Sequence, residues 1–177
     1  VDLYTYFRAH PAYYTPMKDC DAVSEQDRHR YALVLAIGFC YYFRLRQDLR
    51  AEYAAEFVKD GHVFPACKIP GSNVNADPFY WTFREVGMNL YKNTEFLDGV
   101  APTNPFLQNL LLTVVCIDAK IPLMIVGPPG CSKTLSFSVA MANMKGVGSP
   151  KEFYKTLSHV YPIRYQCSLD SADTEVE

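Results

Sequence analysis

The segment formed by residues 121–144 limits the possible folds of this chain more than any other part. A short apolar run, Ile121–Val126, ends at a glycine and is followed by a loop rich in Gly and Pro. Helical periodicity then extends from Leu135 to Met144. A short apolar run that ends at a glycine is typical of a buried parallel strand. This order predicts a strand–loop–helix unit and therefore an α/β architecture.

The loop itself has the pattern of a phosphate-binding loop, G-x-x-x-x-G-K-[ST]. Its glycines allow backbone conformations that a side chain would hinder, and amides at a helix N-terminus can surround phosphate oxygens. Lys133 adds a positive charge for the phosphates, and the Thr134 hydroxyl can ligate Mg²⁺. We therefore predict a site for a nucleoside triphosphate and Mg²⁺. The predicted nucleotide-binding residues are Gly127, Pro128, Pro129, Gly130, Cys131, Ser132, Lys133 and Thr134.

One position departs from the pattern, because Ser132 stands where the glycine before the lysine is usual. If this residue adopts a positive φ, a serine there costs about 1 kcal/mol or more of strain. Its hydroxyl could instead cap the helix or contact a phosphate. The alternative is a chance Pro/Gly turn before a helix that happens to begin with Lys-Thr. The apolar run before the loop and the helix after it favour the phosphate loop.

The first 60 residues divide into two stretches. Residues 1–23 mix aromatic residues with prolines and show no sustained periodicity, which predicts a loop or short packed turns. Ser24 is a good helix N-cap, and a helical pattern follows it as far as Asp60. We expect one helix here, or two with a bend near Gln47.

Glycines and prolines punctuate residues 61–105, which predicts a loop-rich connector with a short helix around Tyr80–Leu90. Over Asn104–Asp118 the apolar residues follow the i, i+3, i+4 spacing of an amphipathic helix. The last part, Thr113–Asp118, superficially resembles an apolar strand that ends in an acidic residue. Helical spacing fits it better, and the acidic strand of a nucleotide-binding fold should follow the loop rather than precede it.

Two more elements are expected after the loop and its helix. Lys151–Val160 predicts a short amphipathic helix, and Ile163–Cys167 predicts a second strand. A nucleotide-binding sheet needs about four or more strands to bury both faces. We therefore expect residues 1–103 to form a mainly helical, loop-rich segment. Residues 104–177 should form the first part of a P-loop NTPase core, truncated before the acidic strand, with the sheet incomplete in this chain.

Composition excludes several other classes of protein. The 177 residues include 17 basic and 19 acidic side chains, a net charge of −2, which gives no general attraction to nucleic acid. The longest apolar stretches fall short of the roughly 20 residues that cross a bilayer, so no transmembrane segment is predicted. The six cysteines are far apart and lack metal-ligand spacing, which favours reduced thiols in the cytosol.

Three stretches together resemble one family, the mysterin-like giant AAA+ RING-type E3 ubiquitin ligases. The loop Gly127–Thr134, with serine in place of the usual glycine, resembles the family's nucleotide loop. Arg30–Leu45 is similar to the helical segment that precedes this loop, and Tyr165–Ser168 is similar to the strand after it. The resemblance spans residues 24–172. The phosphate loop alone would specify only a P-loop NTPase.

This resemblance implies an ATP-binding module in a ring of AAA units, within a very large and mainly cytoplasmic protein. It implies ATP and Mg²⁺ as cofactors and neighbouring AAA modules of the same long chain as partners. In the family, ubiquitin and an E2 enzyme act through a distant zinc-containing region, whose Cys/His spacing is not found in this chain. The positions that match the family's loop are Gly127, Gly130, Ser132, Lys133 and Thr134.

Hydrolysis requires more than a phosphate-binding loop. It needs a carboxylate at the end of another strand and usually an arginine from a neighbouring module. No apolar run leads into a carboxylate after Thr134, so no catalytic residue is assigned. Two functions stay open: an ATP-binding segment whose catalysis is completed elsewhere, or a structural module that holds ATP for ring assembly, which Ser132 mildly favours. A small-molecule kinase is disfavoured, because no lid-like arginine cluster follows Thr134.

Overall fold

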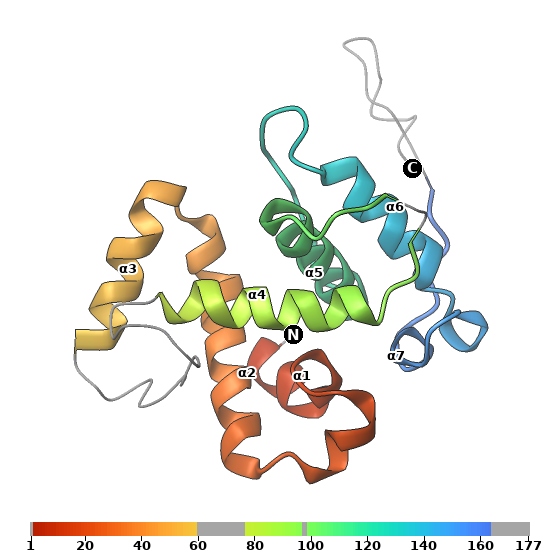
Figure 1. Cartoon of the computed structure of the whole chain (residues 1–177), viewed down its shortest axis with the longest axis horizontal. Helices are drawn as coiled ribbons and strands as arrows, with labels where there is room; N and C mark the ends of the chain where they lie inside the picture. The colour runs from red at the N-terminus through yellow and green to blue at the C-terminus, as the bar shows by residue number, and fades with distance from the viewer. Residues whose placement is uncertain (1, 60–76, 97–98, 164–177) are drawn as a thin grey trace.

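The structure, a computed structural model, describes residues 2–59, 77–96 and 99–163 of the chain. In this part the chain forms seven α-helices joined by loops and short 3₁₀ turns (Figure 1). The α-helices are α1 (Leu3–Ala9), α2 (Glu25–Cys40), α3 (Gln47–Lys59), α4 (Pro78–Lys92), α5 (Asn104–Asp118), α6 (Lys133–Asn143) and α7 (Glu152–Lys155). The 3₁₀ turns are Pro11–Tyr13, Met17–Ala22, Tyr42–Arg44 and Gly146–Gly148.

The predicted α/β architecture is wrong for the part of the chain that the structure describes. Ile121–Val126, expected as a buried strand, is not in a strand. Its side chains are largely open to solvent, with Met124 86% and Val126 85% exposed. A strand needs neighbours that pair with its backbone N–H and C=O groups. No described segment pairs with this apolar run as a neighbouring strand would, so it has no strand structure.

The second expected strand, Ile163–Cys167, lies almost entirely outside the described residues. Its first residue, Ile163, is described and is 93% exposed, without strand structure. Among the described residues, the β-type pairing is limited to an isolated antiparallel bridge between Lys145 and His159. The incomplete P-loop NTPase sheet that the sequence suggested is therefore replaced, in this part of the chain, by helices.

The N-terminal 23 residues are more regular than predicted. Instead of a loop alone, they contain α1, which Asp2 caps by accepting a hydrogen bond from the Tyr4 amide at 3.0 Å. Phe7 on α1 is fully buried. Two 3₁₀ turns follow, and these agree with the short packed turns that were expected. The helix was missed because seven residues are too few to show a clear helical period.

The helical pattern after Ser24 is confirmed as two helices. The Ser24 hydroxyl accepts a hydrogen bond from the Asp27 amide at 3.1 Å, as expected for an N-cap. The helix α2 ends at Cys40, and α3 begins at Gln47 after a 3₁₀ turn. The bend near Gln47 is thus a full break between two helices.

The helices α4 and α5 form the centre of the molecule, where α4 crosses α2 and α5 (Figure 1). The helix α5 has the predicted bounds, and Thr113–Asp118 is its last part rather than a strand. Close crossings depend on small residues. A Cβ atom on Gly38 of α2 would lie 2.1 Å from the Phe83 ring of α4. A Cβ atom on Gly87 of α4 would lie 3.0 Å from Cβ of Leu107 on α5.

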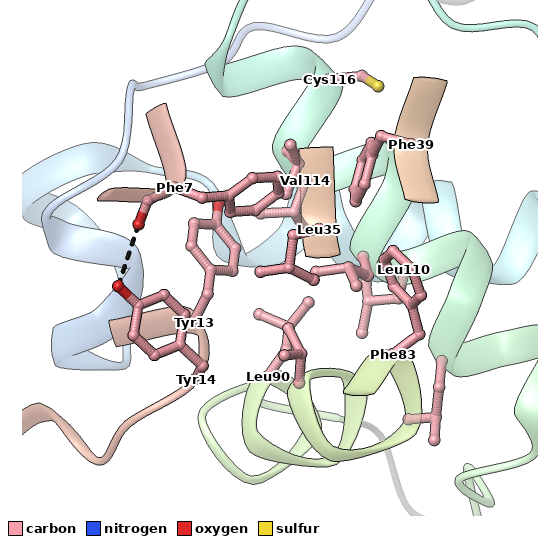
Figure 2. Close-up of a cluster of buried hydrophobic side chains, with 14 of the residues drawn as sticks. Phe7, Tyr13, Tyr14, Leu35, Phe39, Phe83, Leu90, Leu110, Val114 and Cys116 are labelled. Carbon is pink, nitrogen blue, oxygen red and sulfur yellow. Dashed lines mark hydrogen bonds between the residues drawn. The ribbon is translucent and has the colours of Figure 1, made fainter. Parts of the chain in front are cut away.

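One hydrophobic cluster joins these helices (Figure 2). It is rich in aromatic rings, and it draws on both of the segments predicted from the sequence, residues 1–103 and 104–177. The Tyr13 ring meets the Phe153 ring edge-on, with centroids 5.1 Å apart, so the two ends of the described chain share this core. The division into two segments stays a prediction.

None of the described helices is both long and apolar enough to cross a membrane.

Candidate phosphate-binding loop

The first six predicted nucleotide-binding residues, Gly127–Ser132, lie in the loop between α5 and α6, and the last two, Lys133 and Thr134, begin α6 (Figure 1). Residues 127–130 are exposed, and residues 131–133 are half-buried where the loop enters α6. Thr134 is exposed in the first turn of the helix. The helix that was expected over Leu135–Met144 is confirmed as α6, which begins two residues earlier, at Lys133.

Two glycines in the loop have a structural reason to be glycine. Gly130 has φ +81°, a left-handed conformation that side chains disfavour. A Cβ atom on Gly127 would lie only 3.0 Å from the Cys131 sulfur, so the two sides of the loop approach each other closely there. The chain can therefore curl tightly enough to bring several backbone groups around one point.

Of the two possibilities that the sequence left open for Ser132, a strained positive φ or a capping hydroxyl, the structure has the strained conformation. Its φ of 62° and ψ of 18° lie in the left-handed region, and its side chain makes no capping hydrogen bond to α6. A non-glycine residue in this region costs about 1 kcal/mol or more. The backbone carbonyl of Ser132 accepts the first helical hydrogen bond, from the Ser136 amide at 2.9 Å.

The Lys133 side chain folds back into the loop. Its Nζ donates hydrogen bonds to the carbonyl oxygens of Gly127, at 2.7 Å, and Pro128, at 2.8 Å. The Cys131 sulfur lies 3.3 Å from the same nitrogen. The loop thus wraps around a single ammonium group, and its positive charge adjoins the N-terminus of α6, where helix amides also carry partial positive charge.

Asn109 supports the loop from α5. Its Nδ2 donates a hydrogen bond to the Cys131 carbonyl at 2.7 Å. The sequence alone does not mark Asn109 as part of the site, since a single asparagine on an amphipathic helix gives no local signal. Its role depends on how α5 packs against α6, which only the structure reveals.

Asp118 is engaged elsewhere in the structure. It is the last residue of α5, and its carboxylate accepts hydrogen bonds from the Tyr6 hydroxyl at 2.7 Å and the Ser158 amide at 2.8 Å. The Tyr6 hydroxyl also lies 2.9 Å from that of Tyr13. Burial raises the pKa of both tyrosines well above the usual value. This polar group joins the N-terminal turns to α5 and to the segment after α7.

Other metal-binding or thiol chemistry has little support in the described residues. They contain no group of three or more His, Cys, Asp or Glu side chains placed to hold a metal ion. Four cysteines are described, and all four are free thiols: Cys20, Cys40, Cys116 and Cys131. Burial raises the pKa of the Cys116 thiol to about 11.

A lysine-containing glycine loop at the start of a helix is typical of the P-loop class of nucleotide-binding proteins. Comparison with known proteins gives the family within that class. Residues 99–177 match the family model described as the RNF213 AAA domain. RNF213 is another name for mysterin, so the resemblance seen in the sequence is confirmed, and the chain is an RNF213-like AAA fragment.

Several relatives match most of the chain. The E3 ubiquitin-protein ligase rnf213-beta of Danio rerio is 29% identical over 167 residues, or 94% of the chain. The E3 ubiquitin-protein ligase RNF213 of Homo sapiens is 30% identical over 155 residues, or 84% of the chain. A Dictyostelium discoideum protein, uncharacterized and named as transmembrane, is 33% identical over 173 residues, or 89% of the chain. The chain spans about 3% of the length of each of these relatives.

Proposed function

We propose that the loop Gly127–Thr134 binds the phosphates of ATP, as the nucleotide-binding segment of an AAA+ module. The observation that carries this proposal is the position of Lys133, whose ammonium group is held by the Gly127 and Pro128 carbonyls beside the N-terminus of α6. The loop therefore already surrounds one charged group. A phosphate chain offers that ammonium group stronger, negatively charged acceptors than two neutral carbonyls.

The N-terminus of α6 supplies the second part of the proposed site. The first amides of a helix lack intrahelical partners, and here Ser132 leaves them without a side-chain cap. Such amides bind phosphate oxygens, and the helix dipole favours the negative charge. Thr134, exposed on the first turn, is the side chain that would hold Mg²⁺ with the nucleotide. Bound Mg²⁺ would neutralise phosphate charge.

We also propose a function for the longer protein that contains this chain. By its relation to the E3 ubiquitin-protein ligases of zebrafish and human, we propose that it is a giant AAA+ ubiquitin ligase. Ubiquitin and an E2 enzyme would then act through other regions, and neighbouring AAA modules would contact this one. The cytoplasm is the compartment we propose, and the nearly balanced charge of this chain offers no general surface for nucleic acid.

A second candidate is a structural module that holds ATP without hydrolysing it. It is favoured by the strained Ser132, which departs from the glycine that is usual at this position of the loop. Single-turnover hydrolysis in the full-length protein, with and without Lys133→Ala, separates the two candidates. If the module hydrolyses ATP, turnover at this module is lost in Lys133→Ala. If the module is structural, neither the wild type nor the variant shows turnover at this module.

Calorimetric titration of this chain with ATP and Mg²⁺ tests the proposal directly. We expect saturable binding, and we expect Lys133→Ala to weaken it by about tenfold or more, the effect of one charge-assisted contact. Lys151→Ala is the matched control, because Lys151 is an exposed lysine outside the loop. Equal affinity in the wild-type chain and in Lys133→Ala would show that the loop is not the binding site.

A further inference from the structure

One hydrogen bond from α5 sets the orientation of a peptide group in the loop. Asn109 Nδ2 donates to the carbonyl oxygen of Cys131 at 2.7 Å. That carbonyl belongs to the peptide group that joins Cys131 to Ser132, which is trans like every described peptide bond. The C=O and N–H of a trans peptide point in opposite directions. Since the carbonyl faces α5, the Ser132 N–H faces away from α5. We call the side of the loop that lies away from α5 its open side.

The same peptide group forces Ser132 into its strained conformation. Ser132 has φ 62° and ψ 18°, in the left-handed region. Turning the Cys131–Ser132 peptide over by half a rotation would bring φ of Ser132 to about −120°, a conformation that serine adopts readily. The turned peptide would exchange the two groups, so that a carbonyl oxygen faces the open side. A carbonyl oxygen there would repel a phosphate instead of donating a hydrogen bond to it.

We propose that Asn109 is a positioning residue for the loop, which holds the Cys131–Ser132 peptide with its N–H toward the phosphates of the nucleotide. The inference rests on the proposed function of the loop. The strain at Ser132 favours rotation of the Cys131–Ser132 peptide, and the hydrogen bond from Asn109 opposes that rotation. The two residues therefore have opposite effects on the same peptide group. A loop with glycine at residue 132, which tolerates positive φ, would need this support much less.

The test is a double-mutant cycle on ATP affinity, measured by calorimetry with Mg²⁺ on this chain. Asn109→Ala should weaken binding about fivefold, as the loss of one ordinary hydrogen bond does. In the Ser132→Gly background the same change should have an effect of less than about twofold, because the strain that drives the rotation is gone. Gln108→Ala, one residue earlier on α5, is the control and should bind as the wild type does.

Each outcome of the cycle decides the proposal. Equal losses in both backgrounds would mean that Asn109 acts without orienting this peptide, and no loss in the single variant would mean that it does not act at all. If Asn109→Ala only loosened the packing of α5, Ser132→Gly would not restore affinity, and the losses would again be equal in the two backgrounds. Equal losses, or no loss in the single variant, overturn the proposal.

A second measurement is independent of nucleotide. The three-bond coupling between the amide proton and Hα of Ser132, read by NMR without ATP, reports φ directly. It should change in Asn109→Ala and stay unchanged in Gln108→Ala. If the wild-type chain binds no ATP but this coupling changes, the proposed function fails while the peptide lock remains. An unchanged coupling in Asn109→Ala overturns the lock itself.

Discussion

The hydroxyl of Tyr6 donates a 2.7 Å hydrogen bond to the carboxylate of Asp118, which lies 112 residues later in the chain. The other oxygen of the carboxylate accepts the Ser158 amide at 2.8 Å. Asp118 therefore joins α1, the end of α5 and the segment after α7. A residue that once suggested an acidic strand is instead a junction between three parts of the fold.

Loss of this junction should destabilise the chain. Asp118→Ala removes the acceptor from the half-buried Tyr6 hydroxyl and from the exposed Ser158 amide. Each of these hydrogen bonds contributes about 0.5 to 1.5 kcal/mol, so the two together are worth about 1 to 3 kcal/mol. We expect a decrease of that size in the free energy of unfolding measured with urea. Glu52→Ala, which removes an exposed carboxylate from α3, should change it by less than about 0.5 kcal/mol. Equal effects of the two changes would contradict the assigned role.

The crossing of α2 and α4 should not tolerate a side chain at residue 38. A Cβ atom on Gly38 would lie 2.1 Å from the buried Phe83 ring, so Gly38→Ala should cost about 1 to 3 kcal/mol by overpacking. Adding Phe83→Leu makes room and should recover part of that loss in urea unfolding. Gly148→Ala serves as the control, because the nearest atom to its Cβ would be 4.0 Å away. A neutral Gly38→Ala would show that the helices separate easily.

Alkaline pH should unfold the chain through its buried tyrosines. Burial raises the pKa of Tyr14 to about 12 from an ordinary value of 10.0. The unfolded chain therefore loses this proton first, and stability present below pH 10 is lost progressively as the pH rises toward 12. Tyr14→Phe should reduce the slope of unfolding free energy against pH by up to about 1.4 kcal/mol per pH unit. Urea titrations at a series of pH values from 8 upward measure this, and an unchanged slope would refute it.

Thr134 should act through Mg²⁺ rather than through the phosphates alone. We expect Thr134→Ala to remove most of the gain in ATP affinity that Mg²⁺ gives, while affinity in the presence of a chelator changes little. Thr134→Ser keeps the hydroxyl and should keep the gain. Calorimetric titrations with and without Mg²⁺ compare the three proteins. Equal losses of affinity in both conditions would assign Thr134 to phosphate binding or to helix stability instead.

The sequence predicted those elements whose signals are local. The bounds of α5 agree with the amphipathic spacing over Asn104–Asp118, and the capping hydroxyl of Ser24 fixes the start of α2. The sequence also marked Ser132 as the position where glycine is usual, because Lys133 and Thr134 follow it, and it left a positive φ there as one of two possibilities. In each case a few adjacent residues carry the physical cause.

The features that were missed depend on distant partners. Ile121–Val126 has the composition of a buried strand, but composition does not supply the neighbours that would pair with it. Asn109 acquires its role only because α5 packs against α6. The junction at Asp118 likewise depends on Tyr6, more than a hundred residues away, and no local pattern could have revealed it.

The contact between Tyr13 and Phe153 has a consequence for how this chain is made. A ribosome releases the N-terminal turns long before it releases α7. Until Phe153 emerges, the Tyr13 ring lacks the partner that it meets edge-on in the finished core, and nascent aromatic surface stays accessible to chaperones.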